Sequence, residues 1–143
     1  MTWGEIQISA LKKMFAKDEP IKISELSTLR EDDDTKVYLN NMIEVANEAI
    51  SRILAYCDNN WEYSEEAKKY VIKEKYRITE ATKESEKIKL PEEACDLIPL
   101  YIASQLYKDD DIAQATQYRN EFETGLQELV RYINNQTEVE MIF

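Results

Sequence analysis

The chain contains no histidine, and the side chains whose types and spacing most directly raise the question of a catalytic or metal site are its carboxylates and two cysteines. Histidine is the usual general base in catalysis and completes the Glu-x-x-His pattern of di-iron helical bundles. The two glycines, Gly4 and Gly125, cannot form a loop that cradles a phosphate. The residue types therefore do not indicate an enzyme, and we expect neither catalytic residues nor a cofactor.

The acidic residues do not follow a catalytic or metal-binding pattern. Adjacent pairs, such as Glu92 with Glu93, diverge on a helix instead of sharing one site. The acidic run 31–34 lacks the central glycine of a calcium loop. We therefore expect no metal ion, and we interpret this run as a favourable start for the helix that follows, where negative charge suits the helix dipole.

The two cysteines, Cys57 and Cys95, are far apart in the sequence and have no metal-ligand spacing. Each falls on the apolar face of a predicted helix. We expect buried free thiols, since small buried cysteines behave as apolar side chains. A disulfide between them is the less favoured alternative.

Apolar residues at steps of three and four predict about four helices. The predicted spans are 3–16, 35–57, 91–106 and 112–133, with a short helix capped by Ser24 and ending at Arg30. Thr2 and Glu5 form a capping box for the first span, Pro91 suits the first position of the third, and Asp111 can cap the last. The predicted inner face of the last helix is Ile112, Ala115, Tyr118, Phe122, Leu126, Leu129 and Ile133.

Residues 61–90 lose this helical pattern. Tyr70 with Ile72, and Tyr76 with Ile78, alternate at period two, which favours a short hairpin or a projecting loop. A helix over 67–75 is the competing interpretation. We therefore predict one domain, residues 1–143, with an all-α fold: a bundle of about four helices and a short β-hairpin or loop inserted before a C-terminal helical hairpin.

The charge of −11 argues against a DNA-binding surface. Its distribution is uneven: residues 61–90 carry 8 basic and 7 acidic side chains, whereas residues 91–143 carry 3 basic and 11 acidic ones. The acidic part is either an ordinary solvated surface, a face for a basic partner, or the wall of a channel that does not grip DNA. No apolar stretch is long enough for a membrane helix, and the first residues lack the basic-then-apolar layout of a signal peptide, so we expect synthesis in the cytoplasm and no membrane.

Residues 134–143 form an apolar-tipped tail that either packs on its own bundle or docks in a partner. Trp3 could anchor the first helix to the core or to a neighbouring molecule, with the core favoured. Tyr70 and Tyr76 lie in the mixed basic and aromatic segment, which could contact DNA or a partner subunit. A solvated loop that packs its tyrosines locally is the simpler interpretation.

The residues of the last third follow a recurring pattern. An opening "LP-E-A-x-x-L-I-P-L-Y-I-A-x-x-L-Y" is followed by an Asp-rich turn and a second helix "A-x-x-Y-x-N-E-F-E". Its members here are Leu90, Pro91, Glu93, Ala94, 97–103, Leu106, Tyr107, Ala115, Tyr118, Asn120, Glu121, Phe122 and Glu123. This stretch resembles the C-terminal helical hairpin of the head-to-tail connector (adaptor) proteins of tailed bacteriophages. The start, MTWGEIQISALKKMF, is similar to connector-like proteins of phages from low-GC Gram-positive bacteria, and together the two stretches cover roughly half of the chain.

The resemblance implies a structural virion protein at the head–tail junction of a phage or prophage, assembled in the host cytoplasm. It implies a ring, by resemblance a dodecamer, that lies under the portal protein, joins the head to the tail and continues the DNA channel without reading the DNA sequence. Its partners would be the portal, neighbouring copies of itself and the next tail-side connector. By resemblance, the tail residues that would hold the portal are Val139, Met141, Ile142 and Phe143. Trp3, Tyr70 and Tyr76 are the candidates for neighbour or channel contacts.

The alternative function, from another class, is a small acidic helical regulator that binds one protein partner as a monomer or dimer. It would use the same tail or Trp3 as its anchor. A DNA-mimicking inhibitor is a third interpretation, and the mixed-sign charges fit it poorly. The identity of flanking genes separates the first two, since portal, capsid and tail genes nearby favour the connector.

Overall fold

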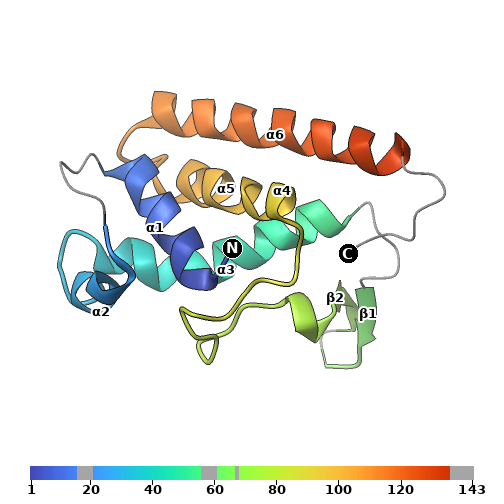
Figure 1. Ribbon diagram of the computed structural model, residues 1–143, viewed down its shortest axis with the longest axis horizontal. Coiled ribbons are helices and arrows are strands. Elements are labelled where there is room, and N and C mark those ends of the chain that lie inside the picture. Colours follow the sequence, from blue (N-terminus) through green and yellow to red (C-terminus); the bar gives the residue numbers. More distant parts are fainter. Residues whose placement is uncertain (16–20, 56–60, 67, 136–143) are drawn as a thin grey trace.

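The computed structural model describes residues 1–15, 21–55, 61–66 and 68–135, and its body is a bundle of helices (Figure 1). The longer helices are α1 (Trp3–Met14), α3 (Lys36–Leu54), α5 (Leu97–Leu106) and α6 (Ile112–Asn135). The shorter ones are η1 (Ile23–Glu25), α2 (Leu26–Leu29), η3 (Glu74–Tyr76) and α4 (Glu92–Cys95). The predicted all-α class is confirmed.

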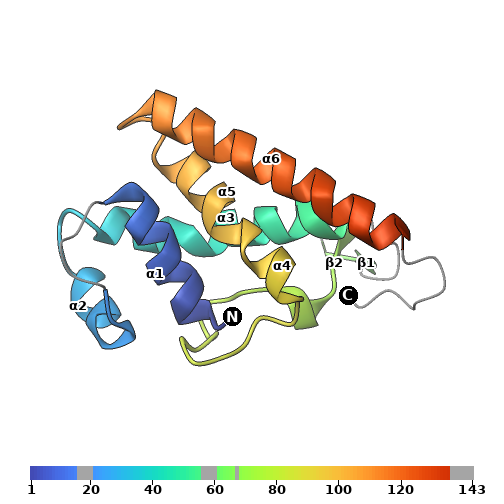
Figure 2. The ribbon, with the colours of Figure 1, turned by 45° about the horizontal axis from the view of Figure 1, so that its top comes forward.

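Helix α5 is the centre of the bundle. It contacts α1, α3 and α6, which surround it (Figures 1 and 2). Its buried residues occur all around the helix, as expected for a helix that is apolar on every side. They are Leu97, Ile98, Pro99, Tyr101, Ile102, Ala103 and Ser104. The hydrophobic core is therefore built around the segment that carries the motif.

The predicted single helix over 91–106 is wrong, because Pro99 interrupts it. A proline has no N–H to donate to the carbonyl four residues earlier, here that of Cys95, and its ring clashes with that carbonyl. The chain accordingly ends α4 at Cys95 and starts α5 at Leu97, with Asp96 between them. Pro91 lies just before α4, as its N-cap, one position earlier than predicted.

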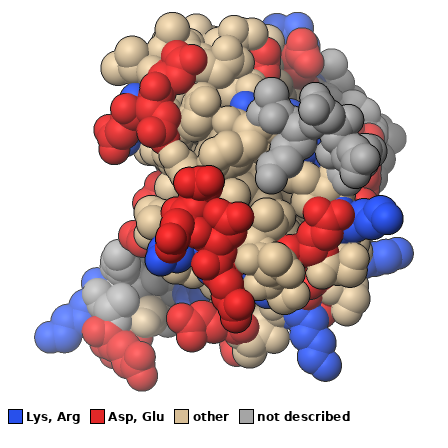
Figure 3. Space-filling model, turned by 90° about the vertical axis from the view of Figure 1, so that its left-hand side faces the viewer, with Lys and Arg blue, Asp and Glu red and all other residues tan. Residues whose placement is uncertain are grey.

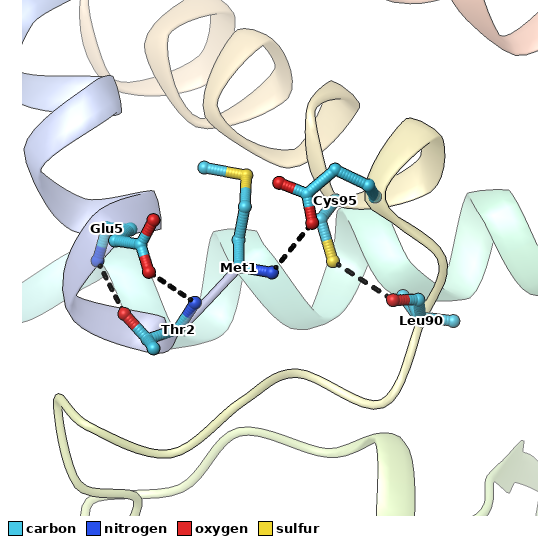
Figure 4. Close-up of polar contacts among 6 residues, drawn as sticks. Met1, Thr2, Glu5, Leu90 and Cys95 are labelled. Carbon is cyan, nitrogen blue, oxygen red and sulfur yellow. Dashed lines mark hydrogen bonds and ion pairs between the residues drawn. The ribbon is translucent and has the colours of Figure 1, made fainter.

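The free N–H groups at the start of α1 are hydrogen-bonded by its own capping box and by a segment from much later in the chain. Glu5 N donates to Thr2 Oγ1 at 3.2 Å and the Glu5 carboxylate accepts from Thr2 N at 3.2 Å, which confirms the predicted box (Figure 4). Trp3 N and Gly4 N donate to the carbonyls of Glu86 and Glu84, both at 2.9 Å. The first N–H groups of α1, which lack partners within the helix, are all satisfied in this way. We call residues 84–88, which run across this end of α1, the strap.

Helix α3 starts after the acidic run, as predicted, and its apolar face points into the core. Lys36 pairs with Asp33 at 2.8 Å in its first turn. Thr35, the residue before the helix, makes no side-chain cap, and its hydroxyl donates to the carbonyl of Leu29 instead. The buried residues of α3 are Leu39, Met42, Val45, Ala46, Ala49, Ile50, Ile53 and Leu54. The predicted end at Cys57 lies outside the described residues, and α3 itself ends at Leu54.

The predicted cap at Ser24 is wrong. Lys22 and Glu25 precede η1 and α2, neither makes a side-chain cap, and Ser24 lies inside η1.

The segment 61–90 begins with two short strands and then returns to the bundle. β1 (Trp61–Ser64) and β2 (Lys69–Ile72) pair antiparallel, with Trp61 opposite Ile72. Further on, the side chain of Asn47 on α3 holds the backbone of Ile78. Asn47 Nδ2 donates to the Ile78 carbonyl at 2.8 Å, and Ile78 N donates to Asn47 Oδ1 at 2.9 Å. Because Ile78 is also buried, this part of the segment is fixed to the helical body.

Helix α6 packs along α5 through one face. Asp111 Oδ1 accepts from Gln114 N at 3.1 Å, which confirms the predicted cap. The predicted inner face holds for Ala115, Phe122, Leu126 and Leu129, which are buried, but it is wrong for Ile112, which is 73% exposed. The side chain of Ile133 lies outside the described residues. Among the helices of the described ranges, none combines the length and apolar character needed to cross a membrane.

Candidate interaction surfaces

The predicted portal anchors cannot be located in the fold. Val139, Met141, Ile142 and Phe143 lie outside the described residues. Tyr70 is placed only by its backbone, in β2, where it pairs with Tyr63. The assignments of these five residues remain predictions.

Trp3 and Tyr76 contribute to the core of their own subunit. The exposed fractions of Trp3 and Tyr76 are 2% and 3%, and both belong to the hydrophobic core. The prediction that they contact a neighbour or a channel is therefore wrong for this fold, and the core alternative for Trp3 is confirmed. The backbone N–H of Trp3 donates to the carbonyl of Glu86 in the strap, and the residue lines a cavity together with Leu39 and Ile43 of α3.

A groove lined by carboxylates lies where the start of α3 meets the turn between α5 and α6. We call it the acidic groove. Its volume is about 490 Å³. It is lined by Asp33, Asp34, Val37, Tyr38, Asn41, Gln105, Leu106, Asp109 and Asp110. Figure 3 shows this end of the molecule, where acidic side chains gather on the surface.

One hydrogen bond joins the two sides of the acidic groove. The hydroxyl of Tyr38, on α3, donates to Asp110 Oδ2 in the α5–α6 turn. This bond, together with burial and the nearby negative charge, raises the pKa of Tyr38 to about 12. Phe15 packs edge-on against the Tyr38 ring, with 5.2 Å between ring centroids. The wall of the groove is thus fixed by contacts from three parts of the chain.

The same end of the molecule carries apolar side chains in contact with water. Val37, inside the acidic groove, is 57% exposed, and Ile112, directly after the Asp-rich turn, is 73% exposed. Among the described residues, the only other large hydrophobic side chain that counts as exposed is Ile23, at 41%. Single exposed hydrophobic side chains of this kind are ordinary on protein surfaces.

A second polar cluster surrounds Tyr101, between α3, α5 and α6. The Tyr101 hydroxyl accepts from Arg52 Nε at 3.0 Å and donates to Glu48 Oε2 at 3.1 Å. The guanidinium groups of Arg52 and Arg119 lie 5.4 and 5.3 Å from the centre of the Tyr101 ring. Phe122 packs on the same ring, with 5.0 Å between centroids. The satisfied hydroxyl and the stacked cations indicate a role in stabilising the helix packing.

A further cavity of about 510 Å³ lies between α1, α3 and the segment 79–84, which includes the first residue of the strap. Gln7, which lines it, is 3% exposed, and its Oε1 atom has no hydrogen-bond partner among the described residues. Arg30 and Glu84, which also line it, form an ion pair.

The thiol of Cys95 is buried and unreactive. Cys95 is buried and free, and its thiol donates to the carbonyl of Leu90 at 3.5 Å (Figure 4). Burial raises its pKa to about 11, so the thiol stays protonated at neutral pH and is a poor nucleophile. Nearby, the amino group of Met1 pairs with Glu92 at 3.1 Å. The expectation of a buried free thiol is confirmed for Cys95, whereas Cys57 lies outside the described residues.

Sequence reasoning missed the acidic groove. Each of its two acidic runs was interpreted separately, as a helix start and as a turn, and neither run carries a signal that they meet. Across the part of the chain that the structure describes, no three cysteine or acidic side chains are grouped so that they could hold a metal ion. Comparisons with protein-family models, with curated proteins and with solved structures found no match for this chain.

Proposed function

We propose that this chain is a structural subunit of a ring that lies under the portal of a tailed phage or prophage. The proposal rests on one observation, the resemblance of residues 90–123 to the C-terminal hairpin of head-to-tail connectors. In the fold, these residues form α4, α5, the Asp-rich turn and the first half of α6. The motif therefore falls on the helices that build the core and on the turn that lines the acidic groove.

The proposed ring would continue the DNA channel between the head and the tail. A protein with a net charge of −11 repels the phosphate backbone, which suits a channel through which DNA must slide. The apolar tail, Val139 with Met141, Ile142 and Phe143, would hold the portal. The segment 61–90 would face the next tail-side connector or the channel. By resemblance the ring has twelve copies.

The test is assembly with the portal protein encoded nearest to this gene. The purified chain and the portal are mixed and examined by size-exclusion chromatography and negative-stain electron microscopy. A chain truncated after Gln136 is examined in parallel, together with a full-length control in which Val139, Met141, Ile142 and Phe143 are replaced by serine. We expect a ring stacked on the portal with the full chain, and none with either variant.

The contrary result is equally clear. If the full chain remains a monomer or dimer with every neighbouring portal, the connector proposal is wrong and a small helical regulator becomes the better interpretation. If the ring forms equally well without the apolar side chains, the ring stands and the tail is not its anchor.

A further inference from the structure

We infer that the cavity between α1, α3 and the segment 79–84 binds a short uncharged peptide segment of a partner protein, and that the side chain of Gln7 holds the backbone of that segment. The cavity lies apart from the acidic groove, and none of the predicted portal anchors lines it. Peptide binding at this site does not depend on the proposed ring.

The cavity is lined by buried polar groups that the fold leaves without partners. Gln7 is 3% exposed, and its Oε1 atom has no hydrogen-bond partner among the described residues. Within the same part of the chain, its Nε2 atom and the indole N–H of Trp3 have no acceptor. The two residues are four positions apart on α1, so their side chains are neighbours on one face. Because a buried carboxamide without partners destabilises a fold, its position here indicates a partner from outside the chain.

The chain itself shows how a side-chain amide can bind peptide backbone. Asn47 Nδ2 donates to the Ile78 carbonyl at 2.8 Å, and Ile78 N donates to Asn47 Oδ1 at 2.9 Å. One carboxamide thereby satisfies both backbone groups of a single residue. Gln7 carries the same carboxamide on a side chain one methylene longer, with one donor end and one acceptor end. It can therefore pair with the N–H and C=O of one residue of an incoming peptide.

The remaining residues of the cavity define the kind of peptide. Leu39 is buried and Ile43 is half-buried, and both provide apolar surface for an aliphatic side chain. The charged residues that line the cavity are two basic and two acidic ones, Arg30, Lys83, Glu80 and Glu84. Arg30 and Glu84 already form an ion pair with each other. Since these charges balance, the cavity favours neither an anion nor a cation, which indicates an uncharged segment with an aliphatic residue.

An NMR titration of the full-length, ¹⁵N-labelled chain tests the site. The probe is the blocked tripeptide Ac-Ala-Leu-Ala-NH2. We expect saturable shifts of the Gln7 side-chain amide and the Trp3 indole N–H signals, with a Kd no weaker than about 1 mM for a ligand of this size. A Trp61→Phe variant identifies the Trp3 indole signal, because the chain contains two tryptophans.

A substitution of Gln7 separates peptide binding from folding. Gln7→Met removes the carboxamide and keeps a side chain of similar length. Because the carboxamide has no partner in the fold, this variant should keep or raise the melting temperature, whereas it should bind the peptide at least about tenfold more weakly. Gln127→Met, at an exposed position of α6, is the matched control and should bind like the unmodified chain.

A modified peptide tests the same contact from the other side. Methylation of the leucine nitrogen removes the N–H that would donate to Gln7 Oε1. The methylated tripeptide should bind the unmodified chain at least about tenfold more weakly than the parent peptide. Equal binding of the two peptides would exclude the backbone pairing.

Further results would also overturn the inference. If about 10 mM tripeptide causes no saturable shift, the cavity holds only water. If Gln7→Met binds the tripeptide as well as the unmodified chain does, the carboxamide does not hold the peptide. A lower melting temperature of Gln7→Met would show that the carboxamide serves the fold of its own chain. If N-acetylleucinamide binds as tightly as the tripeptide, the site takes a free small amide and not a segment of a partner protein.

Discussion

Helices α5 and α6 form one hairpin, yet they relate to solvent in opposite ways. α5 is buried on nearly every side, whereas α6 buries one face and leaves the other in water. The apolar residues of α5 are thus explained by the core alone. The difference shows that the motif over 90–123 consists mainly of packing residues, so the surface of α6 and the Asp-rich turn are where this hairpin can meet other molecules.

The largest loss of stability should come from a substitution on the buried face of α6. Phe122 is fully buried against Tyr101, and Phe122→Ala should lower the free energy of unfolding by about 3–5 kcal/mol because it leaves a cavity. Ile112→Ala, on the same helix, should change it by less than about 0.5 kcal/mol, since Ile112 is 73% exposed. Urea denaturation followed by circular dichroism measures both. Equal losses would contradict the contrast between the two positions.

A smaller loss of stability should follow from a substitution that pushes α5 and α6 apart. A Cβ at Gly125, on α6, would collide with Leu97 Cδ2 on α5, so the helices approach closely there. Gly125→Val should cost about 1–3 kcal/mol through overpacking. In a Leu97→Ala background the same change should cost less, because the colliding atom is gone. Thermal and urea denaturation of all four chains gives this double-mutant comparison, and an unchanged cost would exclude the Leu97 contact as the cause.

The polar contact of α5 should have a more modest effect. Tyr101→Phe removes the hydroxyl that bonds Arg52 and Glu48 but keeps the ring on which two arginines stack. We expect a loss of about 1 kcal/mol, the ordinary net contribution of a hydrogen bond, because the Glu48 partner is exposed to water. The loss should shrink in an Arg52→Ala background, as measured by urea denaturation. A loss that is the same in both backgrounds would show that Arg52 does not depend on this hydroxyl.

The smallest effect concerns pH at the α5–α6 turn. The pKa of Tyr38 is raised from 10.0 to about 12, so between these values the folded chain retains a proton that the unfolded chain releases. The stabilisation from the protonated hydroxyl is therefore complete below pH 10 and is lost as the pH rises to about 12. Absorbance titration of tyrosinate should show one late-titrating group in the unmodified chain that is absent in Tyr38→Phe. Identical titration of the remaining tyrosines, with no late group in either chain, would contradict this assignment.

The sequence predicted the parts of the fold that depend on neighbours in the chain. The capping box at Thr2 and Glu5, the cap at Asp111 and the apolar face of α3 each follow from residues within a few positions of one another. The break at Asp96 can also be predicted from the sequence, because Pro99 cannot donate a hydrogen bond to the carbonyl four residues earlier and its ring clashes with that carbonyl. It was missed because the apolar periodicity continues across the break.

The features that were missed depend on contacts between distant residues. The burial of Tyr76 depends on how segment 61–90 returns to the bundle, where Asn47 holds Ile78 across 31 positions. The exposure of Ile112 follows from where α6 begins to contact α5. The acidic groove joins Tyr38 to Asp110, 72 positions apart, and periodicity carries no information at that range.

The strap has a consequence for how the chain is made. The carbonyls that accept from Trp3 N and Gly4 N belong to Glu86 and Glu84, so the first helix cannot complete its hydrogen bonds until those residues have been translated and have left the ribosome. Closing so long a loop costs entropy before the contact stabilises anything, which slows folding. At ordinary translation rates of about 5–20 residues per second, α1 waits several seconds with its N-terminal end open. Until then the apolar face of α1, which α5 covers in the folded chain, stays exposed to water.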